Sequence, residues 1–242
     1  MKYATAKEHR DFFNKNRIIE FEGLFPEELA KSMSQGIEEV LANRLKSTGD
    51  KLKSIHPEEL FLQSRHLWME SEALKKGVML HQLGQIAFEL FEQKPIRFGY
   101  DQYLPFYRSA IQNKEIPYGN FLKKHLTLEE VSPIQTAVGG LMIALPKKHK
   151  AKKTLEIPTE PQTTIFPTQA GSGVFISADT PLDLTPLMGG DEPLFHYLLI
   201  VYTTGTSVYV SNREDPLLHT LRHLGYAYGD RLNDLQNPIV FR

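Results

Sequence analysis

The chain has 242 residues, of which 41% are hydrophobic and 24% charged, a composition typical of a globular protein that buries a full core. Its net charge of −1 and a pI near 6.8 argue against a general attraction to nucleic acid or anionic membranes. The lack of cysteine excludes disulfides, thiolate metal sites and cysteine nucleophiles. No apolar run reaches the roughly 20 residues of a membrane span, and the start has no signal-peptide pattern, so we expect no membrane association and a cytoplasmic protein.

The first 95 residues predict a mainly helical cover. Residues 4–15 form a short amphipathic helix pattern, with Thr5 as the candidate cap and Phe12 and Phe13 on the buried face. A short strand is expected at residues 17–21, before Gly23.

A longer helix is expected to begin near Pro26, which two acidic residues follow, and to end before Gly49. Its apolar residues lie on one stripe: Leu29, Met33, Ile37, Val40, Leu41 and Leu45. Residues 56–93 predict two further helices with a break near residues 64–71. Trp68, the only tryptophan, is expected to pack this helical stretch against a sheet.

From residue 96 to residue 212 the pattern changes to short β-branched and aromatic runs separated by Gly and Pro, typical of a sandwich or barrel. The expected strands are IRFGYDQYLPF, SPIQTAVGGLMIALP, TTIFP, SGVFISA, FHYLLIVYTT and SVYVSN. The segments LMIAL and YLLIVY are apolar at every position, so both faces of these strands should be covered. Residues 213–242 predict a helix and an extended tail, completing a single α+β domain over residues 1–242.

The order of these elements resembles the phytanoyl-CoA dioxygenase-like branch of the non-haem Fe(II)/2-oxoglutarate-dependent oxygenases. FFNKNRIIEFEGLFPEEL resembles the opening motif of that branch, GGLMIALP its central strand, and AGSGVFISADTPLD its later Gly-Asp-x-x-x-Phe strand. The resemblance covers nearly the whole chain. It implies a double-stranded β-helix (jelly-roll) core with N-terminal helices packed on one sheet.

The family's chemistry needs two histidines and a carboxylate on one face of the iron. At the expected His-x-Asp position the only histidine is His125, and Thr127 stands where the acid should be. Glu129 and Glu130 lie nearby at the wrong offset. The His-x-Asp pair that the resemblance implies is therefore incomplete, because its histidine is present and its acid is not.

The distal histidine of the family is expected near residues 181–185, where the sequence reads PLDLT, so Asp183 could serve only by an exchange of ligand type. No Arg or Lys follows in PLMGGDEPLFHYLLIVYT to pair with the far carboxylate of 2-oxoglutarate. His196 in that strand is interpreted as a hydrogen-bonded core or edge histidine. His9 and Asp11 match His-x-Asp but precede every barrel strand, so this match is dismissed.

His219 and His223 are four residues apart, a spacing that metals use on one helical face, with Asp215 as the only acid on that face. A charged outer face of a C-terminal helix is the simpler interpretation. The segment GYAYGDRL lacks the spacing of a phosphate loop and predicts a helix end and turn.

A run of lysines around His149 is the most concentrated charge in the sequence: Lys147, Lys148, Lys150, Lys152 and Lys153. Such a run can contact nucleic acid or an acidic partner, or it can be a solvated loop between strands. The solvated loop is favoured because no aromatic residue lies among the lysines.

A polar aromatic group lies on and after the first barrel strand: Tyr100, Asp101, Tyr103, Tyr107 and Tyr118. These side chains could line a pocket mouth that holds a small molecule, or pack the strand against helices. Packing is favoured.

Three hypotheses follow. The first is an atypical or inactive member of the oxygenase fold, with no assigned metal ligand, catalytic residue or cofactor-binding residue, which uses the barrel mouth to bind a ligand or partner. The second is an active dioxygenase that binds Fe(II) and 2-oxoglutarate at a displaced site, built from His125, Asp183 or residues elsewhere in the sequence. The third is a metal-responsive regulator or nucleic-acid binder that uses the lysine loop 147–153.

Overall fold

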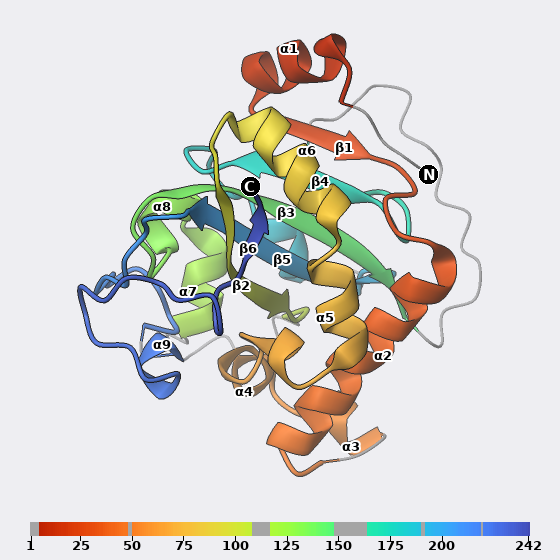
Figure 1. Cartoon of the computed structure of the whole chain (residues 1–242). Helices are drawn as coiled ribbons and strands as arrows, with labels where there is room; N and C mark the ends of the chain where they lie inside the picture. The colour runs from red at the N-terminus through yellow and green to blue at the C-terminus, as the bar shows by residue number, and fades with distance from the viewer. Residues whose placement is uncertain (1–4, 48–49, 108–116, 148–163, 190–191, 219) are drawn as a thin grey trace.

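The computed structural model describes residues 5–47, 50–107, 117–147, 164–189, 192–218 and 220–242 (Figure 1). Its centre is a curled, six-stranded antiparallel sheet in the order β1-β4-β3-β5-β2-β6. The strands are β1 (Ile18–Phe21), β2 (Ile96–Leu104), β3 (Ala137–Pro146), β4 (Gly173–Ser177), β5 (Phe195–Thr204) and β6 (Ile239–Phe241). The mixture of helices and one antiparallel sheet confirms the α+β class.

The predicted strands that contain GGLMIALP and SGVFISA, now β3 and β4, are neighbours in the sheet, with Leu141 opposite Phe175. Strand β5 lies on the other side of β3, so both long apolar strands are internal. Alternate residues of β3 enter different cores: Leu141 lies in one and Met142 in the other. The prediction that these strands are covered on both faces is confirmed.

One face of the sheet is covered by the N-terminal helices, and α5 and α6 cross in front of the strands in Figure 1. Helix α2 packs on α5 and β3 through the predicted apolar stripe, of which Met33, Ile37 and Val40 are fully buried. Trp68 contacts the ring of Phe98 on β2 edge to face, with ring centres 5.6 Å apart, so its predicted packing role is confirmed. The helical segments of this half are α1 (Lys7–Asn16), α2 (Glu27–Arg44), α3 (Asp50–Lys53), α4 (Pro57–Leu62), η1 (Leu67–Met69), α5 (Glu72–Val78) and α6 (His81–Phe91).

The opposite face of the sheet is covered by short helices and the loops between them. These helices are α7 (Pro117–Lys123), α8 (Leu128–Val131), η2 (Thr185–Leu187) and α9 (Thr220–His223). They bury Tyr118, Leu128, Leu187 and Leu221 against the inner residues of β3, β4 and β5. The inside of the curled sheet is therefore an apolar core.

The predicted start of the first helix is partly wrong. Ala6, rather than Thr5, precedes α1, and the Thr5 hydroxyl instead donates to Glu89 of α6. Phe13 is buried as predicted, but Phe12 is 48% exposed because only one of two consecutive helical residues can face the sheet.

Two predicted strands are not strands among the described residues. Ile165 and Phe166 of TTIFP are buried, but they lie in a bend. In SVYVSN, Val208 and Tyr209 form only single bridges, to Arg231 and Ile134. The apolar pattern of these segments therefore indicates that they are buried, and it does not indicate that they pair as strands.

The predicted C-terminal helix is much shorter in the structure, where only the single turn of α9 is helical. Before it, the Asp215 side chain accepts a hydrogen bond from the Leu217 amide at 2.9 Å, which favours a turn over a helix there. The extended tail is confirmed, since β6 pairs with β2 through Ile96 and Phe241. Within the described ranges, no helix combines the length and the apolarity that a membrane span requires.

Candidate functional site

Two of the three positions at which the resemblance expects iron ligands come together in space. Nδ1 of His125 lies 3.7 Å from Oδ1 of Asp183, and both side chains are about half exposed. His125 lies two residues after α7 with φ of 50°, in the left-handed conformation that often follows a helix. The pair therefore lies at the protein surface, where the chain leaves α7.

The remaining groups at this place serve local structure. The Thr127 hydroxyl accepts from the Glu130 amide at 3.2 Å, and the Glu130 carboxylate accepts from the Thr127 amide at 2.8 Å, forming a capping box at the start of α8. The Asp183 carboxylate accepts from the amide and hydroxyl of Thr185 at 3.1 and 2.5 Å. These bonds, with the nearby His125, hold the pKa of Asp183 below its ordinary value despite partial burial.

These residues do not fit the iron centre that the fold family implies. One imidazole and one carboxylate converge, and the residue at the third expected position in the sequence is Thr127, whose neutral hydroxyl caps α8. Among the described residues, no three His, Asp or Glu side chains are grouped so that they could hold a metal ion.

The strand expected to hold the basic partner of 2-oxoglutarate is β5. Its residues on the inner face of the sheet are Tyr197, Leu199 and Val201, which all belong to the apolar core. His196 points to the other face, where its Nδ1 lies 3.0 Å from the Tyr103 hydroxyl and its Nε2 lies 3.5 Å from Glu38. Its burial lowers the pKa of His196 against the opposing effect of Glu38. The interpretation of His196 as a hydrogen-bonded core histidine is confirmed.

The predicted tyrosine group is divided between the two cores. Its members pack inside the protein, as expected, and do not form one shared pocket mouth. Tyr118 stacks on Phe61 with ring centres 4.1 Å apart, and its hydroxyl donates to the Pro105 carbonyl at 2.7 Å. Tyr103 lies in the core under the helices, whereas Tyr107 lies in the opposite one.

Two other candidate groups fall largely outside the described residues. Of the lysine run, the structure describes only Lys147, whose Nζ donates to Glu192 at 2.8 Å and to the Pro193 carbonyl at 3.0 Å. His219 is likewise outside the described ranges, while His223 is exposed. The segment GYAYGDRL forms the predicted turn, with Asp230 accepting from the Ala227 amide at 2.7 Å.

A cavity of about 680 Å³ lies at a different place, where the loop between α4 and η1 meets the segment from Asp215 to Leu224. This volume is in the range of small-molecule sites. Its polar wall contains Arg44, Arg65, His66, Glu70, Asp215 and Thr220.

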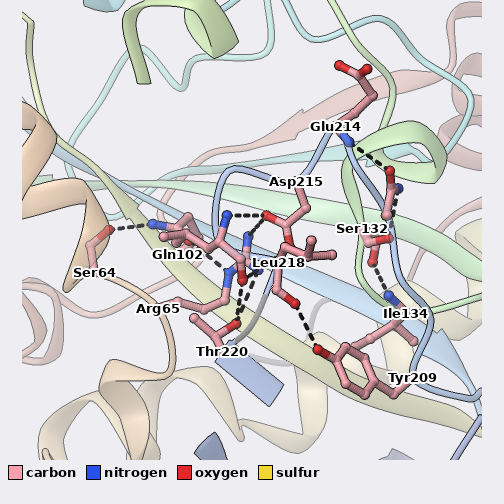
Figure 2. Close-up of polar contacts among 12 residues, drawn as sticks. Ser64, Arg65, Gln102, Ser132, Ile134, Tyr209, Glu214, Asp215, Leu218 and Thr220 are labelled. Carbon is pink, nitrogen blue, oxygen red and sulfur yellow. Dashed lines mark hydrogen bonds and ion pairs between the residues drawn. The ribbon is translucent and has the colours of Figure 1, made fainter. Parts of the chain in front are cut away.

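The loop is fixed because its backbone pairs with β2 beyond the end of β6. The Tyr103 amide donates to the Ser64 carbonyl at 2.9 Å, and the His66 amide donates to the Asp101 carbonyl at 3.1 Å. Between them, the Gln102 side chain donates to the Ser64 hydroxyl (Figure 2). The cavity wall is thus continuous with the main sheet.

A buried ion pair joins this loop to the C-terminal segment (Figure 2). Both terminal nitrogens of Arg65 donate to Asp215, at 2.7 and 2.9 Å, and its Nε donates to Gln102 at 3.0 Å. The Arg65 side chain is 5% exposed and that of Asp215 is fully buried. Burial is the largest single effect on the pKa of Arg65 and lowers it, but Asp215, Tyr100 and Asp101 together outweigh burial and keep that pKa raised. The Tyr209 hydroxyl also holds this segment by donating to the Leu218 carbonyl at 2.8 Å.

Arg44 of α2 closes the same wall. Its guanidinium donates to Glu70 at 2.7 and 3.0 Å, and to the carbonyl oxygens of Gln63, Arg65 and His66 at 2.6, 2.8 and 3.3 Å. These contacts use all five donors of the guanidinium. Arg44 therefore stabilises the loop and presents no open N–H group to the cavity.

His66 differs from its neighbours, because it is 5% exposed and neither ring nitrogen has a hydrogen-bond partner among the described residues. Its backbone is left-handed, with φ of 58°. Burial, with Arg65 and Arg44 nearby, lowers the pKa of His66 to about 3, so the ring is neutral at physiological pH.

Sequence reasoning missed Arg65 and His66 and misplaced Asp215. The segment QSRHLW carries no periodic signal and is interpreted only as a break between helices. Asp215 is interpreted as one acid on the face of a helix, whereas it points inward to a residue 150 positions away. The one available signal is a pair of basic residues beside Trp68, a residue expected to be buried.

Comparisons with known proteins identify the fold. No family model and no curated protein matches the chain. The solved structure of SnoK, a non-heme alpha ketoglutarate dependent carbocyclase from nogalamycin biosynthesis, is similar with a TM-score of 0.61 at 14% identity, covering 96% of this chain and 95% of SnoK. The chain has an oxygenase-like fold.

The epimerase SnoN of the same biosynthesis, also non-heme and alpha ketoglutarate dependent, is similar with a TM-score of 0.59 at 12% identity, covering 96% of this chain and 97% of SnoN. CT296 from Chlamydia trachomatis matches with a TM-score of 0.48 at 15% identity, covering 84% of this chain and 99% of CT296. The likeness to SnoK and SnoN establishes the oxygenase-like fold, and the sequence resemblance is confirmed at that level.

Proposed function

We propose that this protein is an atypical member of the oxygenase-like fold that has lost iron and 2-oxoglutarate chemistry and binds a small molecule instead. We further infer that the six-stranded sheet is the larger sheet of a double-stranded β-helix. On this view the second sheet is reduced to isolated bridges, such as Ile134 with Tyr209 and Val208 with Arg231, with short helices beside them.

The observation that carries the proposal is the state of the three positions at which the resemblance expects ligands. His125 and Asp183 adjoin each other, as ligand positions should, but Thr127 is neutral and caps α8. SnoN has been solved in complex with Fe3+ and alpha ketoglutarate. In this chain one imidazole and one carboxylate are too few to form the facial triad.

The inner face of β5 supports the same conclusion. A dicarboxylate co-substrate needs a cation where it is bound, and an arginine provides the best geometry. Tyr197 and Leu199 instead pack into the apolar core, where the ring centres of Tyr197 and Phe166 are 4.7 Å apart. Burying a carboxylate there without a partner would cost several kcal/mol.

The test is anaerobic titration of the purified protein with Fe(II) in the presence of 2-oxoglutarate, followed by exposure to oxygen. We expect bound iron well below one equivalent and no succinate above the buffer control. One equivalent of iron together with succinate release would refute the proposal.

The approach of His125 to Asp183 favours one second candidate, an oxygenase with a displaced site. That function would need both residues, so any succinate release should disappear in His125→Ala and in Asp183→Ala. It should persist in His81→Ala, which removes an exposed histidine from a different surface, at the start of α6.

A further inference from the structure

The cavity between the α4–η1 loop and the C-terminal segment has two kinds of wall. Its apolar side is formed by leucines: Leu62, Leu217, Leu218 and Leu224. Its polar side contains the Arg65–Asp215 and Arg44–Glu70 pairs together with His66. Such a combination of apolar surface with a few polar groups is usual for sites that hold and orient a small organic molecule.

The charges of this wall are already matched. Arg44 uses its five donors on Glu70 and three carbonyl oxygens, and Arg65 is held at both ends of its guanidinium by Asp215. An anionic ligand such as 2-oxoglutarate would have to take Arg65 from the fully buried Asp215 and leave that carboxylate uncompensated, or take Arg44 from Glu70 and the loop carbonyl oxygens that it holds. The cavity is therefore suited to a molecule without net charge.

Among the buried side chains that line this wall, His66 has unused hydrogen-bonding capacity. A neutral imidazole offers one N–H donor and one acceptor nitrogen, and both nitrogens of His66 are buried without a partner among the described residues. Leaving such groups unpaired costs roughly 1 to 3 kcal/mol each, which a complementary ligand would recover.

We propose that this cavity binds an uncharged small molecule whose apolar body lies against the leucines and whose polar end hydrogen-bonds with His66. This inference rests on the proposed ligand-binding function and gives it a place and a ligand class. The cavity does not include His125 or Asp183, so this site differs from the one at which the resemblance expects iron.

The experiment uses Nile red, an uncharged dye whose emission shifts to the blue in apolar surroundings, as the probe. We expect saturable binding of one dye per chain to the full-length protein, with no displacement by 2-oxoglutarate at millimolar concentration. In ¹⁵N spectra of the histidine rings, the dye should shift the signals that His66→Phe removes.

Two variants locate the binding site. His66→Phe keeps a ring but removes both nitrogens, and should weaken dye binding about tenfold or more. Because Phe is strained at a positive φ, Leu62→Trp provides a second route. Leu62 is 47% exposed, so a larger side chain there should fill the cavity mouth without unfolding the protein. His81→Phe, outside the cavity, is the matched control and should bind the dye as the parent does.

Absence of saturable binding to the parent protein would overturn the inference. So would binding that is unchanged in folded Leu62→Trp, or that 2-oxoglutarate displaces. None of these outcomes restores iron chemistry, whereas iron binding with succinate release refutes the proposed function whatever the dye does. The two failures are therefore distinguishable.

Discussion

Of the three positions at which the resemblance expects iron ligands, 125 carries the expected histidine, whereas 127 and 183 carry Thr and Asp. Asp183 approaches His125, while Thr127 and Glu130 stabilise the first turn of α8. Since an N-cap accepts Asp as readily as Thr, an acid at position 127 would keep the helix start intact. An acid at position 127 is therefore compatible with the stability of α8.

We predict that combining Thr127→Asp with Asp183→His creates a site for a divalent transition metal. Together with His125, the new histidine and the new aspartate supply two imidazoles and one carboxylate. Titration with Co(II) should give visible absorption bands in the double variant and none in the parent. Thr127→Asn with Asp183→Asn is the control, because it keeps the cap without adding ligands. A folded Thr127→Asp, Asp183→His variant that binds no Co(II) would show that these positions do not converge as ligands.

A second residue-scale prediction concerns Asp101, which is fully buried beside the Trp68 amide, while its Oδ1 has no partner among the described residues. Burial raises the pKa of Asp101 to about 7, from 3.8 in the unfolded chain. Between roughly pH 4 and 7 the folded protein holds a proton that the unfolded chain has released, so this group lowers stability as pH rises. His66 acts oppositely: with its pKa lowered from 6.5 to about 3, it lowers stability as pH falls through that range.

Asp101→Asn should therefore be more stable than the parent at pH 8, by roughly 1 to 4 kcal/mol, and nearly equal to it at pH 4. Urea midpoints at the two pH values measure this difference. Asp11→Asn, an exposed acid on α1, is the control and should show no such divergence. Equal stability of Asp101→Asn and the parent at both pH values would contradict a raised pKa.

At the scale of elements, the Arg65–Asp215 pair determines how the C-terminal segment lies on the α4–η1 loop. Arg65 also packs over the Tyr100 ring of β2, with its central carbon 4.3 Å from the ring centre. Loop, strand and C-terminal segment therefore share one charged group, and a buried charge without its partner is expensive.

Removal of either partner should destabilise the protein by about 3 to 5 kcal/mol, because the other charge stays buried. We expect this for Arg65→Met and for Asp215→Leu, measured by guanidinium unfolding. The double variant should lose less than the sum of the two, since no uncompensated charge remains. Strict additivity of the two losses would mean that the pair is not coupled in the folded protein. Lys124 with Glu214, an exposed pair, serves as the comparison and should contribute at most about 1 kcal/mol.

At the scale of the whole molecule, the two cores share the strands β3 and β5, so neither can be exposed without disturbing the other. We therefore predict that residues 1–242 unfold as one domain. Trp68 reports on the core under the helices, and its fluorescence transition should coincide with the loss of far-ultraviolet circular dichroism. Two separated midpoints would instead indicate that the helical cover and the sheet unfold independently.

Much of the fold was predictable because its signals are local. The stripe of α2 and the doubly apolar runs of β3 and β5 depend only on spacing along the chain. The strand predictions for TTIFP and SVYVSN were wrong for the same reason. Apolar content indicates burial, whereas strand pairing also needs a neighbouring strand at the correct register. Likewise, at the start of the predicted C-terminal helix, Asp215 bonds within a turn and to Arg65, which is far along the chain.

By itself, the sequence determined the α+β class, the cover on both faces of β3 and β5, and the neutral residue at position 127. The tertiary structure alone decided that His125 meets Asp183, that Arg65 pairs with Asp215, and that His66 is buried without a partner beside a cavity. The reason is physical: periodicity is a property of neighbouring residues, whereas a cavity and a buried charge pair depend on groups that only the folded chain brings together.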